Sequence, residues 1–432
     1  MAETPADAGP LAGTGPVARR VRAVDPVPIE ARSMPVSPVS VEHVRAAGWR
    51  WEDLWLPVVV LHDSALRYNL ARFARWCDER GMELAPHGKT TMSPHLWSAQ
   101  LDHGAWGLTA ATVAQARVMR RFGVRRILIA NEVLDPAQLA WLATVLDEGD
   151  VEPICLVDSL EGIAAAEHEL AGVASSLPVL VELGVSGRRT GARSAGEALE
   201  LAERVAGSET LRLAGFEGYE GVLPQRRDVD AESAARGWLD TLTEAARRAD
   251  RLGLFAGTGE IVVTAGGSGF ADLAAEALAN LGELSRPVTP VLRSGCYLTH
   301  DDAAYERSSP LRTGADPQPL RQALTCLARV LSVPEPGRAL LGCGKRDIAF
   351  DMDLPVVRAV RRETGRVPVA DRARVVELND HHAYCDVEPG LLTPGDVVEL
   401  GPSHPCTVFD KWSLIPVVDD TGAVVDAVRT CF

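Results

Sequence analysis

The sequence predicts an α/β protein: a parallel (β/α)8 barrel of the TIM type, followed by a C-terminal antiparallel β domain. Between about residues 58 and 297, short apolar runs alternate with segments of helical period, the pattern of parallel strands joined by helices. After about residue 310, Val-rich segments punctuated by Pro and Gly show little helical period, which indicates an antiparallel sheet. A chain of 432 residues, 46% of them hydrophobic, is long enough for two such cores.

Nine apolar runs have the length of strands, one more than an eight-stranded barrel needs. We therefore assign the first run to the second domain. The predicted strands are residues 58–62, 84–87, 106–110, 127–131, 154–158, 179–183, 213–219, 261–265 and 290–293. The predicted helices include residues 64–80, 112–122, 194–205 and 231–252. The predicted strands of the second domain include residues 339–344, 373–378, 396–400 and 413–418.

These patterns divide the chain into four segments. Residues 1–35 are rich in Pro, Ala and Gly and poor in large apolar side chains, so we expect them to form a flexible tail. We expect residues 36–62 to join the β domain, residues 63–309 to form the barrel, and residues 310–432 to form the β domain.

Composition narrows the class of partner. A net charge of -15 without a basic block argues against nucleic acid or an anionic membrane surface as the partner, and favours a small-molecule ligand. No apolar run approaches the ~20 residues of a membrane span. The start of the chain lacks a signal-peptide pattern, and its eight cysteines form no C-x-x-C pair. We expect a cytoplasmic protein with reduced thiols.

Lys89 stands alone in the segment PHGKTT at residues 86–91, where an apolar run gives way to a glycine turn. A solvated lysine normally lies among other charges, whereas a lysine placed here directs its amine into a site. Burial lowers the pKa of an ammonium group, and the neutral amine is a nucleophile toward carbonyl groups. A lysine that only caps a loop is the alternative.

Two glycine turns follow the last two predicted barrel strands, at residues 265–269 and 294–297. Glycine lets backbone amides approach an anion closely, and barrels frequently bind phosphate at the loops after their late strands. An ordinary connection that needs a positive φ is the alternative. We predict that the phosphate-binding residues are Gly266, Gly267, Gly295, Cys296 and Tyr297.

His404 and Cys406 form a candidate metal pair. In an extended segment, residues two apart project to the same side, so an imidazole and a thiolate at this spacing can share one Zn²⁺. Such a pair also occurs often by chance. His381, His382 and Cys385 form a competing group with a similar mix of ligands.

Together these motifs resemble the D-serine dehydratase and D-threonine aldolase family, fold-type III pyridoxal-phosphate enzymes with an alanine racemase-like barrel. The segment around Lys89, the segment ELGVSGRRTG at residues 182–191 and the His-x-Cys pair carry the resemblance, which runs from about Pro57 to the C-terminus. The similarity is greatest to the metal-dependent, D-serine deaminase-like branch.

The resemblance implies roles for several residues. Lys89 would hold pyridoxal 5'-phosphate covalently, beside His87, and Arg189 would face the cofactor, although a surface loop arginine is nearly as common. Tyr219, at a strand end, would either line the site or pack. His404 and Cys406 would bind a divalent metal, Zn²⁺ first, with Mn²⁺ or Mg²⁺ as alternatives. His382 would lie near the substrate, and Cys385 would be a packing residue.

The resemblance also implies an activity. Cysteine in the second metal position is typical of the dehydratases and aspartate of the aldolases, so Cys406 favours conversion of a small D-β-hydroxy amino acid such as D-serine to a 2-oxo acid and ammonia. Retro-aldol cleavage to glycine and an aldehyde is the alternative, and a pyridoxal-phosphate-binding protein without turnover is a weaker one. A homodimer is implied as well.

Overall fold

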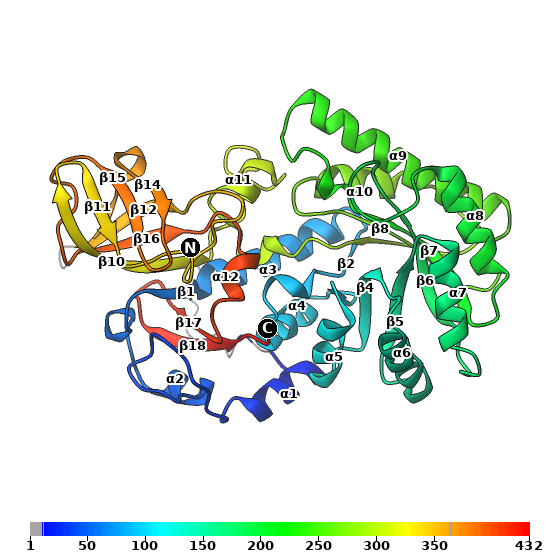
Figure 1. The fold of residues 1–432 in the computed structure, drawn as a ribbon, viewed down its shortest axis with the longest axis horizontal. Coiled ribbons are helices and arrows are strands. Elements are labelled where there is room, and N and C mark those ends of the chain that lie inside the picture. Colours follow the sequence, from blue (N-terminus) through cyan, green and yellow to red (C-terminus); the bar gives the residue numbers. More distant parts are fainter. Residues whose placement is uncertain (1–10, 12, 363–364) are drawn as a thin grey trace.

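The computed structural model describes residue 11, residues 13–362 and residues 365–432, and it has two parts (Figure 1). The first is a curled sheet of eight parallel strands in the order β2-β9-β8-β7-β6-β5-β4-β3. Its strands are β2 (Glu83–Leu84), β3 (Leu108–Ala110), β4 (Arg126–Glu132), β5 (Glu152–Val157), β6 (Leu177–Leu183), β7 (Leu211–Gly218), β8 (Ile261–Ala265) and β9 (Val288–Leu292). The predicted barrel is confirmed.

Backbone hydrogen bonds close the sheet into a barrel. The amide of Trp106 donates to the carbonyl of Leu84 at 2.8 Å, and the amide of Thr109 donates to the carbonyl of Pro86 at 3.0 Å, which joins the segment after β2 to β3. Alternate residues of the strands fill the interior with small and branched side chains, as the twofold period of a strand requires. This inner layer comprises Ala85, Leu128, Ala130, Ile154, Leu156, Leu180, Ala214, Val262 and Val291.

The helices of the barrel lie on its outside, and most begin at a polar residue. Thr112, Asp135, Ser159, Ser194 and Asp228 each accept a backbone amide at the first turn of a helix, which satisfies a donor that the helix leaves free. The helices are α3 (Asp63–Asp78), α4 (Pro94–Asp102), α5 (Val113–Arg121), α6 (Pro136–Glu148), α7 (Leu160–Glu169), α8 (Ala195–Ala206), α9 (Val229–Arg251) and α10 (Ala271–Ala279).

The second part is a largely antiparallel β domain, whose main sheet has the order β13-β12-β16-β10-β1-β17-β18. β1 (Val58–His62) lies between β10 and β17, although more than 260 residues separate it from β10. The other strands are β10 (Leu324–Glu335), β11 (Arg338–Leu341), β12 (Val356–Arg362), β13 (Gly365–Pro368), β14 (Ala373–Leu378), β15 (Ala383–Val387), β16 (Val397–Gly401), β17 (Leu414–Val418) and β18 (Val424–Arg429).

The N-terminal segment differs from the predicted flexible tail. Residues 1–10 and 12 lie outside the described residues, but α1 (Pro16–Val24) is a helix that packs on α4, with Val17, Ala18 and Val21 buried. Asp25, just after α1, lies 2.9 Å from His95 of α4 and also pairs with Arg45. Three apolar side chains on one face of a single helix are enough for docking, and an overall composition does not show that pattern.

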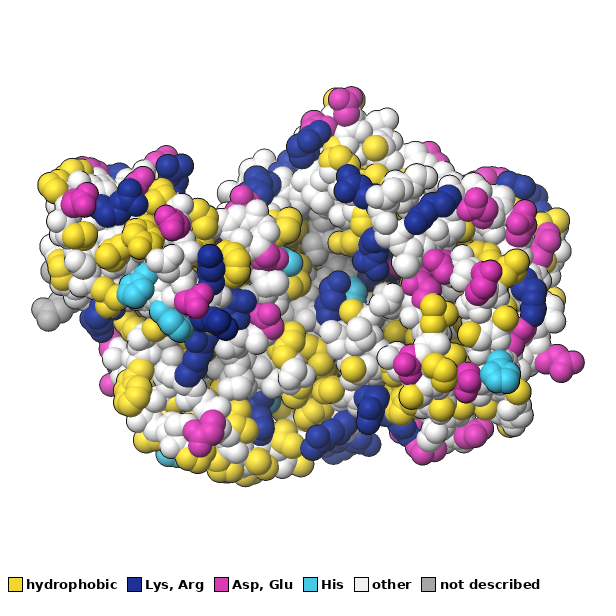
Figure 2. Space-filling model, viewed as in Figure 1, with side chains coloured by type: hydrophobic (Ala, Val, Ile, Leu, Met, Phe, Trp, Pro, Cys, Tyr) yellow, Lys and Arg dark blue, Asp and Glu magenta, His cyan; other side chains and the backbone are white. Residues whose placement is uncertain are grey.

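The two parts meet at the C-terminal ends of the barrel strands. α12 (Cys406–Phe409), from the β domain, contacts the short 3-10 helix η2 (Gly88–Thr90) that follows β2. In Figure 1 α12 lies between the two parts, and Figure 2 shows the surface hollowed there, with basic and histidine side chains inside the hollow. α2 (Val41–Ala46) and α11 (Ala304–Ser308) complete the helices outside the barrel. Within the described residues, no helix is long and apolar enough to cross a membrane.

Candidate active site

A cavity of about 330 Å³ lies at the barrel mouth, where the loops after the strands meet α12. This is the end of a parallel barrel at which loop residues converge. The predicted residues that it brings together are Lys89, His87, Arg189, Tyr219, Gly266, Gly267, Gly295, Cys296, His404 and Cys406. These residues come from the first to the last strand of the barrel and from the β domain, so the fold gathers distant segments in one place.

Lys89 lies in η2, directly after the first strand of the barrel. A Cβ added at Gly88 would meet Met119 and Trp97, and the indole of Trp97 donates to the Gly88 carbonyl at 3.2 Å, so this turn requires glycine. Burial lowers the pKa of Lys89, and Arg189 and Arg293 add to the effect while two nearby cysteines oppose it. The fold thus increases the share of neutral amine, the form that attacks carbonyl groups.

His87 precedes Lys89 and faces the same cavity. Its Nδ1 is buried without a hydrogen-bond partner in the protein. Burial lowers its pKa well below the usual value, and the charges of Lys89 and Arg293 act in the same direction. The imidazole is therefore neutral and offers a free ring nitrogen to a bound ligand.

The glycine turns are only partly free to bind an anion. The amides of Gly266 and Gly267 donate to the buried carboxylate of Glu220 at 3.0 and 2.5 Å. Phosphate binding by these two amides stays a prediction, and it would require them to leave the carboxylate that accepts them in this structure. Glu220 follows the strand that ends at Gly218, and its carboxylate reaches across to the next strand end.

The second turn keeps its predicted role open. A Cβ on Gly295 would lie 2.8 Å from the carbonyl oxygen of His87 and equally close to Thr90 Oγ1, so only glycine fits between this turn and the lysine segment. The amides of Gly295 and Cys296 precede the hydrogen bonds of the 3-10 helix Cys296–Leu298, where helical amides lack partners within the helix.

Tyr297 does not line the cavity. Its ring is buried and stacks on Phe73 with centroids 4.3 Å apart, and its hydroxyl accepts a hydrogen bond from Gln100 at 3.1 Å. The 3-10 turn after Gly295 directs Cys296 into the cavity and Tyr297 away from it. The side chain of Tyr297 therefore does not reach the cavity, and a contact through its backbone amide stays a prediction.

His382 also lies elsewhere in this chain. It is exposed in the turn between β14 and β15 and is not among the residues that line the cavity. Its predicted place beside the substrate is therefore not reached within one chain. Cys385, expected to pack, is fully buried in β15.

His404 and Cys406 meet at the cavity wall. His404 Nδ1 lies 2.7 Å from Asp351 Oδ2, and Cys406 Sγ lies 3.3 Å from Thr90 Oγ1. Burial opposes the charged form of His404, but the Cys406 thiolate and the Asp351 carboxylate outweigh it and raise the pKa to about 9. Hydrogen bonding to Cys296 lowers the pKa of Cys406 against the effect of burial, and His404 assists. Without a metal the pair is therefore an imidazolium and a thiolate of no net charge, and a metal ion that binds here would replace the proton on the imidazole.

Two charged residues of the site were missed by the sequence reasoning. Arg293 forms a buried ion pair with Glu217, and it donates to Thr264 Oγ1 at 2.7 Å and to the Gly218 carbonyl at 2.9 Å. Burial raises the pKa of Glu217 to about 7, although Arg293 opposes the shift. Arg293 ends one predicted strand and Glu217 lies two residues before the end of another, and a charge in an otherwise apolar run was the available signal.

A second acidic group occupies the other side of the barrel mouth. Carboxylate oxygens of Glu132, Asp158 and Glu182 lie within 4.8 Å of one another at the ends of β4, β5 and β6. Burial raises the pKa of Glu132 to about 9, and the neighbouring Glu182 adds to it. Both oxygens of Glu132 lack a donor, so a proton retained on one carboxyl supplies the missing hydrogen bond.

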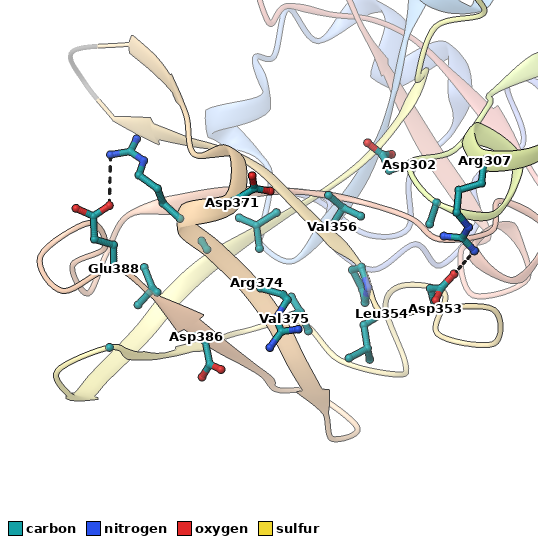
Figure 3. Close-up of a pocket in the computed structure, with 17 residues that line it drawn as sticks. Asp302, Arg307, Asp353, Leu354, Val356, Asp371, Arg374, Val375, Asp386 and Glu388 are labelled. Carbon is teal, nitrogen blue, oxygen red and sulfur yellow. Dashed lines mark hydrogen bonds and ion pairs between the residues drawn. The ribbon is translucent and has the colours of Figure 1, made fainter. Parts of the chain in front are cut away.

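A different groove, with a volume of about 900 Å³, lies in the β domain near α11 (Figure 3). Its lining includes the ion pairs Arg307–Asp353 at 2.5 Å and Arg372–Glu388 at 3.9 Å. The residues described along this groove include no lysine, histidine or cysteine. It therefore lacks the nucleophile and the soft metal donors that the barrel mouth provides.

A parallel barrel with a lysine at its mouth, joined to an antiparallel β domain, defines the class of two-domain proteins with an alanine racemase-like barrel. The family model described as "Alanine racemase, N-terminal domain" matches residues 61–279, half of the chain, and the chain belongs to this family. A second model, "Putative serine dehydratase domain", matches residues 323–418, the segment that contains His404 and Cys406. The resemblance inferred from the motifs is confirmed.

Individual relatives agree with this assignment. The chain is 28% identical to a D-threonine aldolase of Arthrobacter sp over 382 residues, which cover 86% of this chain and 90% of that protein. It is 29% identical to the D-threo-3-hydroxyaspartate dehydratase of Delftia sp. (strain HT23) over 203 residues, 45% of this chain and 52% of that one.

Solved structures show the same fold. The D-threonine aldolase of Filomicrobium marinum superposes with a TM-score of 0.75 and 25% identity, covering 89% of this chain and 97% of the other. A cysteine-to-alanine variant of D-threo-3-hydroxyaspartate dehydratase, in its metal-free form, superposes with a TM-score of 0.69 and 22% identity. The match covers 87% of this chain and 97% of the other.

Proposed function

We propose that the chain is a lyase that uses pyridoxal phosphate and a divalent metal to convert a small D-β-hydroxy amino acid, such as D-serine, to a 2-oxo acid and ammonia. One observation carries the proposal. Lys89, His404 and Cys406 all line a single cavity of about 330 Å³. A base for the α-proton and a site for a metal at the β-hydroxyl are therefore available to one small substrate.

The residues fit both groups. For pyridoxal phosphate, the cavity offers a partly desolvated lysine, the unpartnered Nδ1 of His87 and the amides of Gly295 and Cys296. For a metal, an imidazole and a thiolate meet, and Asp351 holds the imidazole as carboxylates hold metal-bound histidines. Arg189, whose guanidinium carbon lies 5.3 Å from the Tyr219 ring centre, and Arg293 supply positive charge.

The chain's own residues would act as follows. Lys89, once free, accepts the α-proton of the substrate, because its lowered pKa makes the neutral amine available as a base. His404 and Cys406 would hold the metal at the wall of the same cavity. Pyridoxal phosphate supplies an electron sink when the α-proton leaves, and a divalent metal supplies a Lewis acid for the departing hydroxide.

Retro-aldol cleavage is the second candidate, and the relatives support it. The D-threonine aldolase matches most of the chain, whereas the dehydratase matches less than half. In that reaction the base is needed at the β-hydroxyl and the bond between Cα and Cβ breaks. Cys406 in the second metal position supports dehydration instead.

A product assay separates the two reactions. Purified protein loaded with pyridoxal phosphate and Zn²⁺, Mn²⁺ or Mg²⁺ is given D-serine, D-threonine and D-threo-3-hydroxyaspartate in turn. Release of a 2-oxo acid with equal ammonia supports the proposal, and glycine with an aldehyde supports the aldolase. Bound cofactor with neither product from any substrate contradicts both and favours a binding protein without turnover.

We also propose that the protein is a homodimer, since His382 does not reach the cavity of its own chain and the resembled enzymes cover one barrel with the β domain of the other copy. Light scattering after size-exclusion chromatography measures the mass, and a monomer would contradict this proposal.

A further inference from the structure

Cys296 and Cys406 bring two sulfur atoms together at the cavity. Cys296 begins the 3-10 helix after the last barrel strand, and Cys406 begins α12 of the β domain, 110 residues later. The two Sγ atoms lie 3.9 Å apart. One donor atom each of Cys296, His404 and Cys406 lies within 4.8 Å of the other two.

The distance between the sulfurs distinguishes the arrangements that a pair of thiols adopts. A disulfide requires about 2.05 Å between sulfur atoms. A tetrahedral Zn²⁺ with Zn–S bonds of about 2.3 Å places its two sulfurs about 3.8 Å apart. The observed 3.9 Å therefore excludes a covalent bond and equals the spacing of two sulfurs around one ion, and without an ion the two thiols hydrogen-bond at this distance.

We propose that Cys296 is a third protein ligand of the metal, and that the site is a His-Cys-Cys centre selective for a thiophilic ion such as Zn²⁺ over Mg²⁺ and Mn²⁺. This inference rests on the function proposed above, in which His404 and Cys406 hold the metal. It gives the side chain of Cys296 a role separate from its backbone amide, which remains free to bind phosphate.

The orientation of His404 supports a converging donor set. Its Nδ1 is engaged by Asp351 at 2.7 Å, so Nε2 is the ring nitrogen available to the ion. Metal-bound histidines commonly have their second nitrogen held by a carboxylate in this way. Three protein donors around a tetrahedral ion leave one open position, the arrangement of catalytic rather than structural zinc sites.

A second cysteine pair shows that close sulfurs alone do not make such a site. The Sγ atoms of Cys326 and Cys343 lie 3.5 Å apart in the β domain, and both side chains are buried. Among the described residues, no histidine or carboxylate joins them in a three-donor group. That pair is therefore part of the core packing.

The donor set also determines the choice of metal. Thiolates favour Zn²⁺ and Co²⁺, whereas carboxylates, carbonyls and water suit Mg²⁺ and Mn²⁺. With two thiolates the site discriminates more strongly against the hard ions than a single His-Cys pair does. The proposal thus predicts which ion the purified protein retains.

Cobalt substitution counts the thiolates directly. The protein is stripped with a chelator and loaded with Co²⁺ in the absence of substrate, and the charge-transfer absorbance from thiolate to Co²⁺ is recorded for the wild type, Cys296→Ser, Cys406→Ser and Cys431→Ser. We expect each of the first two variants to lose about half of the absorbance and to bind Zn²⁺ at least about tenfold more weakly. Cys431→Ser should match the wild type.

Two further measurements keep the test decisive. Far-ultraviolet circular dichroism and cofactor absorbance of Cys296→Ser should equal those of the wild type, because the substitution keeps the backbone amide. Cys296→Asp should retain three ligands and shift the preference toward Mn²⁺.

The outcomes separate this inference from the proposed function. If Cys406→Ser loses the absorbance while Cys296→Ser keeps both absorbance and Zn²⁺ affinity, Cys296 is not a ligand and only this inference fails. If the wild type binds Mn²⁺ or Mg²⁺ but neither Co²⁺ nor Zn²⁺, this inference fails and the metal-dependent function stands; if it binds none of these ions, the metal-dependent function fails as well. Peptide mapping that finds a Cys296–Cys406 disulfide in the purified, active protein would also overturn the inference.

Discussion

The barrel mouth has two sides with opposite chemistry. On one side, the ends of β2, β8 and β9 carry a lysine and two glycine turns, and the β domain adds an imidazole and a thiolate. On the other side, β4, β5 and β6 end in Glu132, Asp158 and Glu182, whose carboxylates cluster with no basic partner among them. Most residues of both groups are half-buried, and both groups lie at the mouth of the barrel.

The difference shows what turns a strand end into a reactive site. On the first side, a second domain supplies groups of complementary charge, so the Cys406 thiolate and the His404 imidazolium stabilise each other. On the second side only like charges meet, and burial leaves a proton on Glu132. Both groups of residues lie at the barrel mouth, so their position does not explain the difference. The presence or absence of groups from the β domain determines which charges each side carries.

The largest expected effect is that of Lys89→Ala. Removal of the amine eliminates both the covalent anchor and the base, so we expect product release to fall by about 10³-fold or more. Rates of 2-oxo acid and glycine formation from D-serine and D-threonine measure the effect. The exposed Lys345→Ala is the matched control and should keep wild-type rates, whereas a Lys89 variant with a tenth of wild-type activity would contradict the role.

Asp351→Asn tests whether metal binding by His404 and Cys406 depends on the carboxylate that orients His404. The amide no longer holds Nδ1–H as a charged acceptor, so we expect metal affinity to fall about 10–100-fold. Competition with a metal-binding dye gives the affinity, and Asp351→Glu should restore part of it. Equal affinity of the Asn variant and the wild type would show that the contact does not orient a ligand.

Glu132→Gln tests whether the acidic side of the barrel mouth makes the stability of the protein depend on pH. The pKa of Glu132 is raised from 4.5 to about 9. Between pH 4.5 and pH 9 the folded state therefore keeps a proton on this carboxyl, whereas the unfolded state has lost it. Stability should therefore fall as pH rises from 4.5 toward 9. The Gln variant should lose less stability over this range, as measured by urea unfolding at pH 5, 7 and 9. Parallel pH profiles of variant and wild type would contradict a retained proton.

Tyr297→Phe should have the smallest effect on the site. Its hydroxyl bonds Gln100 and not the cavity, so cofactor affinity should stay unchanged while unfolding free energy drops by about 1 kcal/mol. Cofactor titration and urea unfolding measure the two quantities. A tenfold loss of cofactor affinity would show that the Tyr297 hydroxyl contributes to cofactor binding.

The sequence allowed the barrel to be predicted because buried parallel strands read as apolar runs and their helices begin at recognisable caps. Lys89 and the pair His404–Cys406 were identified because each is a local motif. The thiol of Cys296 was not assigned to the metal, since its meeting with Cys406 depends on how the β domain docks on the barrel. Glu220 escaped notice for a similar reason.

Two other differences concern side-chain direction. A 3-10 turn sends consecutive residues to different sides, so the sequence could not show that Tyr297 faces away from the cavity while Cys296 faces into it. Likewise, the docking of α1 depends on a few apolar residues on one face, which the composition of residues 1–35 does not express.

The proposed function requires the amine of Lys89 to hold the cofactor, and the sequence contains three lysines, Lys89, Lys345 and Lys411. Borohydride reduction of the protein saturated with pyridoxal phosphate, followed by peptide mass mapping, identifies the modified amine. We predict one pyridoxyl group per chain, on the peptide that contains Lys89. Modification of Lys345 or Lys411 with Lys89 left intact would contradict the account.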